Sequence, residues 1–169
     1  VPAGLVPGDV VTVAGGQTTE FALSTDTSGR TLTEIEPPMG GMVTITKTGT
    51  GMLPAPVVVD PVALADAIRL QGMTGEPMEV EQWEGVLIKL ENVAAVSSPR
   101  GVSMSDMTLK EMNVTGPFAV NSALASLDNE AEGDCYVSIT GVGDYFFSYK
   151  VLPRSAADLV AGGTMCPPP

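Results

Sequence analysis

The sequence predicts an all-β protein, and two observations lead to this fold class. Aromatic residues make up only 5% of the 169 residues, whereas 19 glycines and 14 prolines interrupt the chain. Between these breakers stand short runs rich in β-branched residues, whose restricted χ1 torsions favour the pleated conformation. Hydrophobic residues make up 44% of the chain, enough to fill a core. We therefore expect short strands joined by turns, with only short helices.

The N-terminal half is expected to hold five strands and one helix. Three of the strands are β-branched runs bounded by glycine or proline, at residues 10–13, 42–46 and 57–59. Residues 21–24 and 31–35 flank an Asp-Thr-Ser-Gly turn, so they are expected to form a hairpin or two short strands. Pro61 suits the first turn of a helix, and apolar residues follow it at helical spacing, which predicts a short helix over residues 61–70.

The C-terminal half is expected to form a five-stranded unit. Residues 85–93 begin as an apolar run and then alternate, which is typical of a long curved strand with one buried face. The other strands are predicted between turn residues, at 107–114, 117–120, 135–142 and 145–152. A Gly- and Pro-containing segment with several glutamates separates the halves. We expect units at residues 1–75 and 76–161, and a Gly/Pro tail at 162–169.

An internal echo indicates a duplicated unit. The sequence GDVVTVAG at residues 8–15 is matched, with one extra residue, by GDCYVSITG at residues 133–141. Each copy later ends in an apolar strand, a proline and a short Ala-rich helix. The strands that open the second copy have no counterpart in the first. The first unit is therefore expected to lack its opening strands and to carry unpaired strand edges.

Part of the chain resembles a known family. The residues that carry the resemblance are WEGVLIKLENV at 83–93, followed by TGV at 140–142, DY at 144–145 and LPRSAAD at 152–158. They are similar to the OB-fold modules of secreted bacterial nucleases and of related Gram-negative surface lipoproteins. The resemblance implies two OB-like Greek-key barrel units, the first incomplete, at an extracellular or cell-surface location. It also implies an accessory role, because such modules carry no catalytic residues of their own.

Charge and composition narrow the function further. The formal charge is -12, from 20 acidic and 8 basic residues, and a protein of this charge repels polyanions. This argues against nucleic acid or an anionic membrane as the main partner. No apolar run approaches the roughly 20 residues that cross a bilayer. The chain has no histidine, so it lacks the commonest general base and metal ligand. We expect no enzymatic activity and no resident cofactor.

The two cysteines are predicted to form a disulfide. Cys135 lies inside an expected strand and Cys166 in the tail, so a bond between them closes a loop worth roughly 3 kcal/mol in the chain-entropy model. An oxidising compartment suits such a bond. The alternative is one buried thiol and one separate thiol in the tail.

An acidic turn is the candidate cation site. Four carboxylates lie close together in the sequence at Asp128, Glu130, Glu132 and Asp134, and calcium prefers such hard oxygen ligands. Their spacing matches no EF-hand loop, so a solvated acidic turn is the favoured interpretation and calcium the alternative.

An aromatic segment is the candidate partner contact. Alternation along one predicted strand places Tyr145, Phe147 and Tyr149 on the same face and Phe146 on the other. Aromatic residues in strands usually pack in a core, and contact with a protein or glycan is the alternative.

These observations favour a non-catalytic extracellular structural or interaction module. We expect its partner to be a protein, including other copies of this chain joined by β-strand addition into a surface or filamentous assembly. Two alternatives remain: an accessory substrate-binding OB domain of a secreted nuclease, and a calcium-dependent glycan-binding module.

Overall fold

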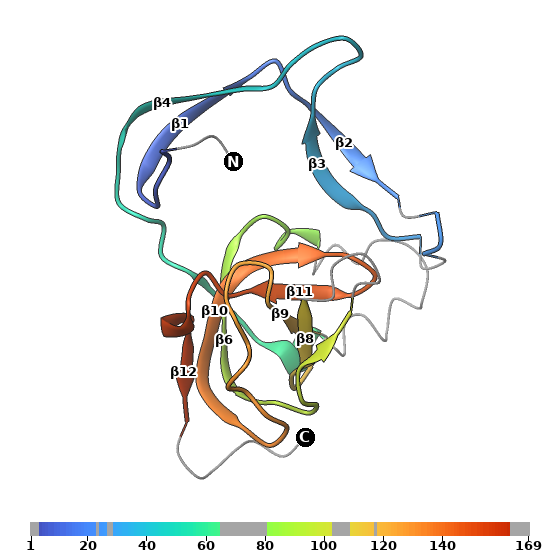
Figure 1. The fold of residues 1–169 in the computed structure, drawn as a ribbon, viewed down its shortest axis with the longest axis vertical. Coiled ribbons are helices and arrows are strands. Elements are labelled where there is room, and N and C mark those ends of the chain that lie inside the picture. The colour runs from blue at the N-terminus through green and yellow to red at the C-terminus, as the bar shows by residue number, and fades with distance from the viewer. Residues whose placement is uncertain are drawn as a thin grey trace.

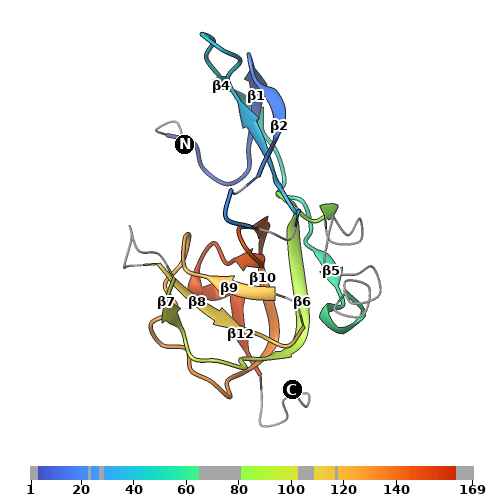
Figure 2. The same ribbon diagram turned by 90° about the vertical axis from the view of Figure 1, so that its right-hand side faces the viewer.

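The structure is a computed structural model, and it describes residues 4–22, 24–26, 29–64, 81–102, 109–116 and 118–162. Within these ranges the regular structure is almost entirely β-strand, which confirms the all-β class. The strands form a ribbon at the N-terminal end and a larger sheet at the C-terminal end (Figures 1 and 2).

The ribbon is a long, bent hairpin. Its four strands are β1 (Asp9–Ala14), β2 (Gln17–Phe21), β3 (Leu32–Glu36) and β4 (Thr44–Thr50). The antiparallel pairings are nested, because β1 pairs with β4 and β2 pairs with β3. The bend lies where β1 passes into β2 through Gly15 and Gly16. A Cβ on Gly15 would lie 2.4 Å from the Met42 carbonyl oxygen, so the two sides of the hairpin pass closely there.

The ribbon meets the rest of the molecule at both of its ends (Figure 1). At its tip, Asp26 accepts a hydrogen bond of 2.5 Å from the Tyr145 hydroxyl, and the Arg30 guanidinium lies 5.3 Å from the centre of the Tyr149 ring. At its base, the chain continues into β5 (Val57–Val59), which pairs in parallel with the first long strand of the larger sheet. The ribbon is therefore an arch attached at two points, called here the tip foot (around Asp26 and Arg30) and the base foot (β5).

The larger sheet, called here the C-terminal sheet, follows the order β5-β6-β10-β11-β9-β8-β7, and β12 adds to β10. Its other strands are β6 (Leu87–Ala94), β7 (Arg100–Gly101), β8 (Lys110–Asn113), β9 (Phe118–Asn121), β10 (Cys135–Tyr145), β11 (Tyr149–Leu152) and β12 (Leu159–Ala161). β9 and β11 pair in parallel, whereas β10 is antiparallel to β6, β11 and β12.

The C-terminal sheet curls but does not close along its strands, and β5 and β7 are its two ends. The end of β6 nevertheless approaches the end of β8, where Ala95 and Val114 form an isolated antiparallel bridge. Val96 donates a backbone hydrogen bond of 2.9 Å to the Asn113 carbonyl, and Thr115 donates one of 3.0 Å to the Ala94 carbonyl.

The core lies inside the curl of this sheet. Five strands contribute fully covered side chains to it: Ile88, Leu90 and Val93 of β6, Met112 of β8, Val120 of β9, Ile139 of β10 and Val151 of β11. The backbone of residues 83–86 crosses close to β10, where Gly85 donates to the Gly143 carbonyl and Gly143 donates to the Val86 carbonyl, both at 2.9 Å. A Cβ at Gly143 would lie 2.2 Å from the Trp83 carbonyl oxygen, so this crossing requires glycine.

Most predicted strands overlap observed ones, but several finer expectations are wrong. The strand expected at residues 21–24 overlaps β2 only at Phe21, its last residue. Residues 145–152 were expected to be one strand, whereas Tyr145 ends β10 and pairs across a hairpin with Tyr149 at the start of β11. The second Ala-rich helix is only a 3-10 turn, η1 (Ala156–Asp158), followed directly by β12. Of the helix expected over residues 61–70, residues 61–64 are helical and the rest lie outside the described residues.

The N-terminal half differs most from expectation. Instead of a partial barrel, the ribbon strands pair among themselves, and β5 joins the C-terminal sheet. None of the apolar residues described between positions 4 and 58 is buried. A two-stranded ribbon has two faces and no second layer, so it cannot enclose a core.

Candidate functional site

A row of polar side chains crosses the C-terminal sheet on the face opposite its core. The residues come from four neighbouring strands: Glu111 of β8, Asn121 of β9, Lys150 of β11 and Asp144 of β10. Registry forms two pairs, with Glu111 opposite Asn121 and Asp144 opposite Lys150, and the ion pair between Lys150 and Glu111 joins them. Alternation along each strand then puts all four on the same face.

This polar row forms the floor of a hollow of about 620 Å³. The walls are mainly apolar and come from the last residue of β11 and from segments next to β8 and β11: Val102, Leu109, Phe146, Phe147 and Leu152. An apolar cavity with a few converging polar groups is the usual form of a small-molecule or side-chain binding site, and its size lies in the usual range.

Lys150 is the charged centre of the floor. Only 5% of the residue is exposed, and it forms an ion pair with Glu111 and donates a hydrogen bond of 3.1 Å to the Ser148 hydroxyl. Asn121 also donates to the Glu111 carboxylate, at 3.0 Å. A buried ammonium group without such partners would cost several kcal/mol, so these contacts hold the lysine in place. The positive charge of Lys150 is therefore already balanced by Glu111.

Asp144 is the second carboxylate in the hollow. It lies directly across from Lys150 in the β10–β11 pairing but forms no ion pair within 4.0 Å with any residue of the described ranges. Partial burial raises the pKa of its carboxyl group. A hydrogen bond from the Tyr145 backbone and the charge of Lys150 act in the opposite direction, and the charge of Glu111 adds a smaller upward contribution. With Glu111 neutralised by Lys150, Asp144 gives the hollow a net negative charge.

Two phenylalanines stand at the rim, on the turn between β10 and β11. Phe146 is 45% exposed and Phe147 is 53% exposed, and their rings meet edge to face with centres 5.1 Å apart. Phe147 has a positive φ of 61°, a conformation that costs an ordinary residue free energy. The turn thus holds an exposed aromatic ring in a strained backbone.

The predicted aromatic face is only partly present. Tyr145 and Tyr149 do share a face, but it is the buried one, where they are 1% and 3% exposed with ring centres 5.0 Å apart. Phe147 does not join them, because the hairpin turn interrupts the alternation that the prediction assumed. Of the three residues proposed for partner contact, only Phe147 has an exposed ring.

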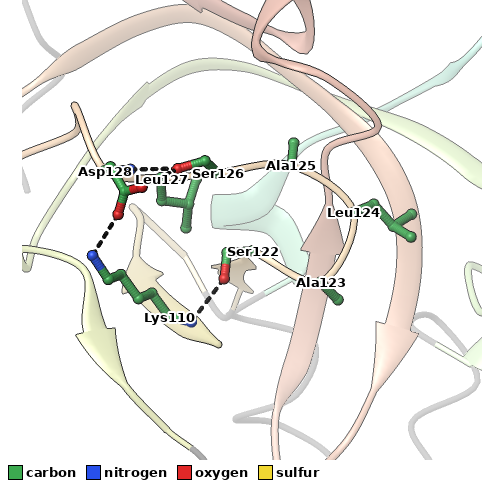
Figure 3. A pocket seen from close by; sticks show the side chains of 8 residues that line it. All are labelled: Lys110, Ser122, Ala123, Leu124, Ala125, Ser126, Leu127 and Asp128. Carbon is green, nitrogen blue, oxygen red and sulfur yellow. Dashed lines mark hydrogen bonds and ion pairs between the residues drawn. The ribbon is translucent and has the colours of Figure 1, made fainter. Parts of the chain in front are cut away.

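The carboxylates of the acidic turn do not converge on a shared position. Asp128 pairs with Lys110 at 2.5 Å and accepts from the Ser126 hydroxyl at 2.7 Å, beside a shallow hollow of about 280 Å³ (Figure 3). The neighbouring carboxylates turn elsewhere: Glu130 accepts from the Tyr136 hydroxyl at 2.5 Å, and Asp134 accepts from the Ala131 amide at 2.6 Å. Calcium binding at Asp128, Glu130, Glu132 and Asp134 thus stays a prediction without a shared ligand geometry.

The disulfide also stays a prediction, because Cys166 lies outside the described residues. Cys135 opens β10, and its carbonyl accepts a hydrogen bond of 2.6 Å from the Gly162 amide, just after β12. Cys166 is four Cα-to-Cα steps beyond Gly162, so chain length keeps the second cysteine within about 14 Å of that point. The pairing of β12 with β10 thus favours the predicted bond.

The polar row was missed in the sequence. Its members lie far apart in the chain, and each occupies an ordinary outward position in an alternating strand. Only the strand order and registry align them. The one available signal was Lys150, a charged residue between Tyr149 and Val151 in an otherwise apolar segment.

Comparison with protein-family models, curated proteins and solved structures finds no match for this chain. In the part of the chain that the structure describes, no helix combines the length and apolar character needed to span a bilayer.

Proposed function

We propose that the chain is a non-catalytic, extracellular interaction module that joins other copies of itself by β-strand addition through the ribbon. The observation that carries the proposal is the ribbon itself, a two-stranded element whose outer edges pair with no other described strand. Such edges present rows of unpaired backbone donors and acceptors, and these are templates for another strand.

The side chains of the ribbon support an intermolecular partner. Large apolar residues are exposed along it, among them Val10, Val11, Val13, Phe21, Ile35 and Met42, with exposed fractions from 39% to 80%. An isolated two-stranded ribbon is at best marginally stable in water. Covering these side chains with a neighbouring strand adds the burial that the ribbon lacks alone.

The edge strand β1 has little of the usual protection against pairing, because its only charged residue is Asp9 at its start and its one irregularity lies next to that end. Residues 10–14 read Val-Val-Thr-Val-Ala, with neither charge nor proline. Edge strands that stay monomeric usually carry lysine, proline or a bulge to block addition. β1 does have a register shift between Val10 and Val11, but the strand continues regularly beyond it to Ala14.

The second part of the proposal is that residues 81–161 form an OB-like barrel. The order of its main strands, with β6 next to β10 and β11 in parallel with β9, supports it. The Ala95–Val114 bridge supports it further, because this bridge brings β6 back to β8 and nearly closes a ring of five strands. The resemblance of residues 83–93 and 152–158 to OB-fold modules of secreted nucleases and surface lipoproteins implies the same arrangement and a cell-surface location.

The test is the oligomeric state of the whole chain and of two matched variants. We expect the unchanged protein to show concentration-dependent assembly in light scattering coupled to gel filtration. A charge on the edge strand, Val11→Lys, should reduce assembly strongly, because lysine on an edge opposes strand addition. The control is Val137→Lys, an equally drastic change at a valine that is 51% exposed in β10, a strand already paired on both sides.

A strictly monomeric protein at all concentrations would overturn the proposal. Equal loss of assembly in the two variants would overturn it as well, since the effect would then come from charge in general and not from the edge of β1.

A further inference from the structure

We propose that the hollow over β8, β9, β10 and β11 binds the guanidinium group of an arginine side chain from a protein partner. The site is separate from the ribbon edges, so this proposal and the assembly proposal can fail independently. Four features support it: the Asp144 carboxylate on the floor, the aromatic rim, the strained turn at Phe147 and the charge of the whole molecule.

The first feature is the balance of charge on the floor. Lys150 and Glu111 neutralise each other, and Asn121 and Ser148 complete their hydrogen bonding. Asp144 lines the same hollow, where its carboxylate accepts a hydrogen bond from the Tyr145 backbone amide but forms no ion pair with a described residue. A cationic ligand would pair with Asp144, and a planar guanidinium matches a carboxylate through two parallel hydrogen bonds.

The second feature is the rim. Phe146 and Phe147 both line the hollow, and both rings are about half exposed. An arginine side chain suits such a rim, because its guanidinium stacks on aromatic faces and its methylene stem packs on apolar walls. Leu109 and Leu152 supply such walls.

The third feature is the strained turn. At a φ of 61°, a glycine at position 147 would relieve backbone strain, yet the turn carries an exposed phenylalanine there. A half-exposed ring adds little burial to the core, so it does not offset the free-energy cost of the positive φ. Contact with a ligand accounts for the presence of a ring at this position.

The charge of the molecule selects the class of partner. With a net charge of -12, the protein attracts basic partners over long range and repels anionic ones. An arginine on a basic protein surface fits both the field and the floor. The partner chemistry is therefore a cationic peptide segment, not a nucleic acid.

The test is a titration of the isotope-labelled whole chain with the peptide acetyl-Gly-Gly-Arg-Gly-Gly-amide, followed by amide chemical shifts. We expect saturable shifts centred on β8, β9 and the β10–β11 turn. The same peptide with citrulline, which keeps the shape but loses the charge, should bind at least about tenfold more weakly.

Three variants sharpen the test. Asp144→Asn should weaken binding by about tenfold or more, since it removes the carboxylate that receives the guanidinium. Phe147→Gly should weaken binding without lowering the Tm, because it removes the ring and relieves the positive φ. Glu132→Gln removes an equal charge from the distant acidic turn and should leave binding unchanged apart from a small field effect.

Several outcomes would overturn the proposal: no saturable shift, shifts centred elsewhere, or equal binding of the citrulline peptide. Equal binding of a lysine peptide would also overturn it, because a simple point charge would then suffice. If Glu132→Gln weakened binding as much as Asp144→Asn, general attraction would explain the result and the assigned site would be wrong.

Discussion

At the scale of single residues, Gly143 leaves less room for a Cβ than any other described glycine. Its backbone exchanges two hydrogen bonds with residues 85 and 86, and a Cβ there would lie 2.2 Å from the Trp83 carbonyl oxygen. The obstacle is backbone, which cannot rotate away as a side chain can. The crossing of this segment over β10 therefore depends on one missing methyl group.

We predict that Gly143→Ala lowers the free energy of unfolding by about 1–3 kcal/mol, as expected of overpacking. The control is Gly101→Ala, where the added Cβ would lie 4.0 Å from the Leu109 carbonyl oxygen, an ordinary contact. That variant should stay within about 0.5 kcal/mol of the original protein. Urea denaturation measures both, and equal effects of the two variants would contradict the assigned crossing.

Asp144 and Asp158 make a matched pair for the effect of pH on stability. Burial raises the pKa of Asp144 above its ordinary value of 3.8, so the folded protein binds this proton more tightly than the unfolded chain. Stability from this group therefore falls as pH rises from 3.8 through the raised folded value. At neutral pH the buried charge is a cost, so Asp144→Asn should raise the free energy of unfolding. Below pH 3.8 the two proteins should converge.

The pKa of Asp158 is shifted in the opposite direction, so its effect on stability depends on pH in the opposite way. Its hydrogen bonds with Arg154, at 2.7 and 3.0 Å, are the main cause that lowers the pKa of its carboxyl group. This contribution to stability is present above pH 3.8 and is lost as pH falls through the lowered folded value. Asp158→Asn should therefore be destabilising at neutral pH, with the difference fading in acid. Denaturation at several pH values checks both, and the same sign for both variants would contradict the two environments.

At the scale of elements, strand positions were predictable and their partners were not. Runs such as residues 57–59 and 135–142 show themselves through β-branched residues and flanking turn residues, and both are strands. The parallel pairing of β5 with β6 gave no sequence signal, because any apolar strand of that length can pair there. The sequence did not indicate the turn at residues 146–148, because this segment contains two phenylalanines and no glycine, proline or asparagine.

The candidate site was less predictable than the strands for the same reason. The acidic turn and the aromatic segment stand out as local clusters, whereas Glu111, Asn121, Asp144 and Lys150 meet only through registry. Local clusters are visible in a sequence, and alignment across a sheet is a tertiary property.

The β10–β12 pairing leads to a prediction about the cysteines. Gly162 lies against Cys135, and we expect Cys135 and Cys166 to be bonded and to tie the tail to β10. Labelling of the unfolded, unreduced protein should find no reactive thiol, and labelling after reduction should find two. Two reactive thiols before reduction would contradict the bond. The variant Cys166→Ser should then lower stability by about 2–4 kcal/mol.

At the scale of the whole molecule, charge opposes the assembly that the ribbon favours. Each copy carries a charge of -12, so copies repel one another at low ionic strength. The Debye length shrinks from about 30 Å at 0.01 M salt to about 3 Å at 1 M. We predict that the assembled fraction rises over this range, as measured by light scattering at fixed protein concentration. A fall in assembly with salt would instead indicate ion pairs at the contact, which the apolar ribbon does not provide.

The two feet of the ribbon differ in the way they would resist a pulling force. The base foot is backbone pairing, in which residues 57–59 of β5 lie alongside residues 88–90 of β6. The tip foot involves no strand pairing among the described residues. It consists of the contacts of Asp26 and Arg30 with two tyrosines and of the hydrogen bonds that Thr33 donates to the carboxylates of Glu81 and Glu84. If copies are joined through the ribbon, tension along the assembly would load both feet, and the tip would detach first. The ribbon would then straighten and lengthen while the core of the C-terminal sheet stayed folded, so each subunit would act as an extensible, reversible link.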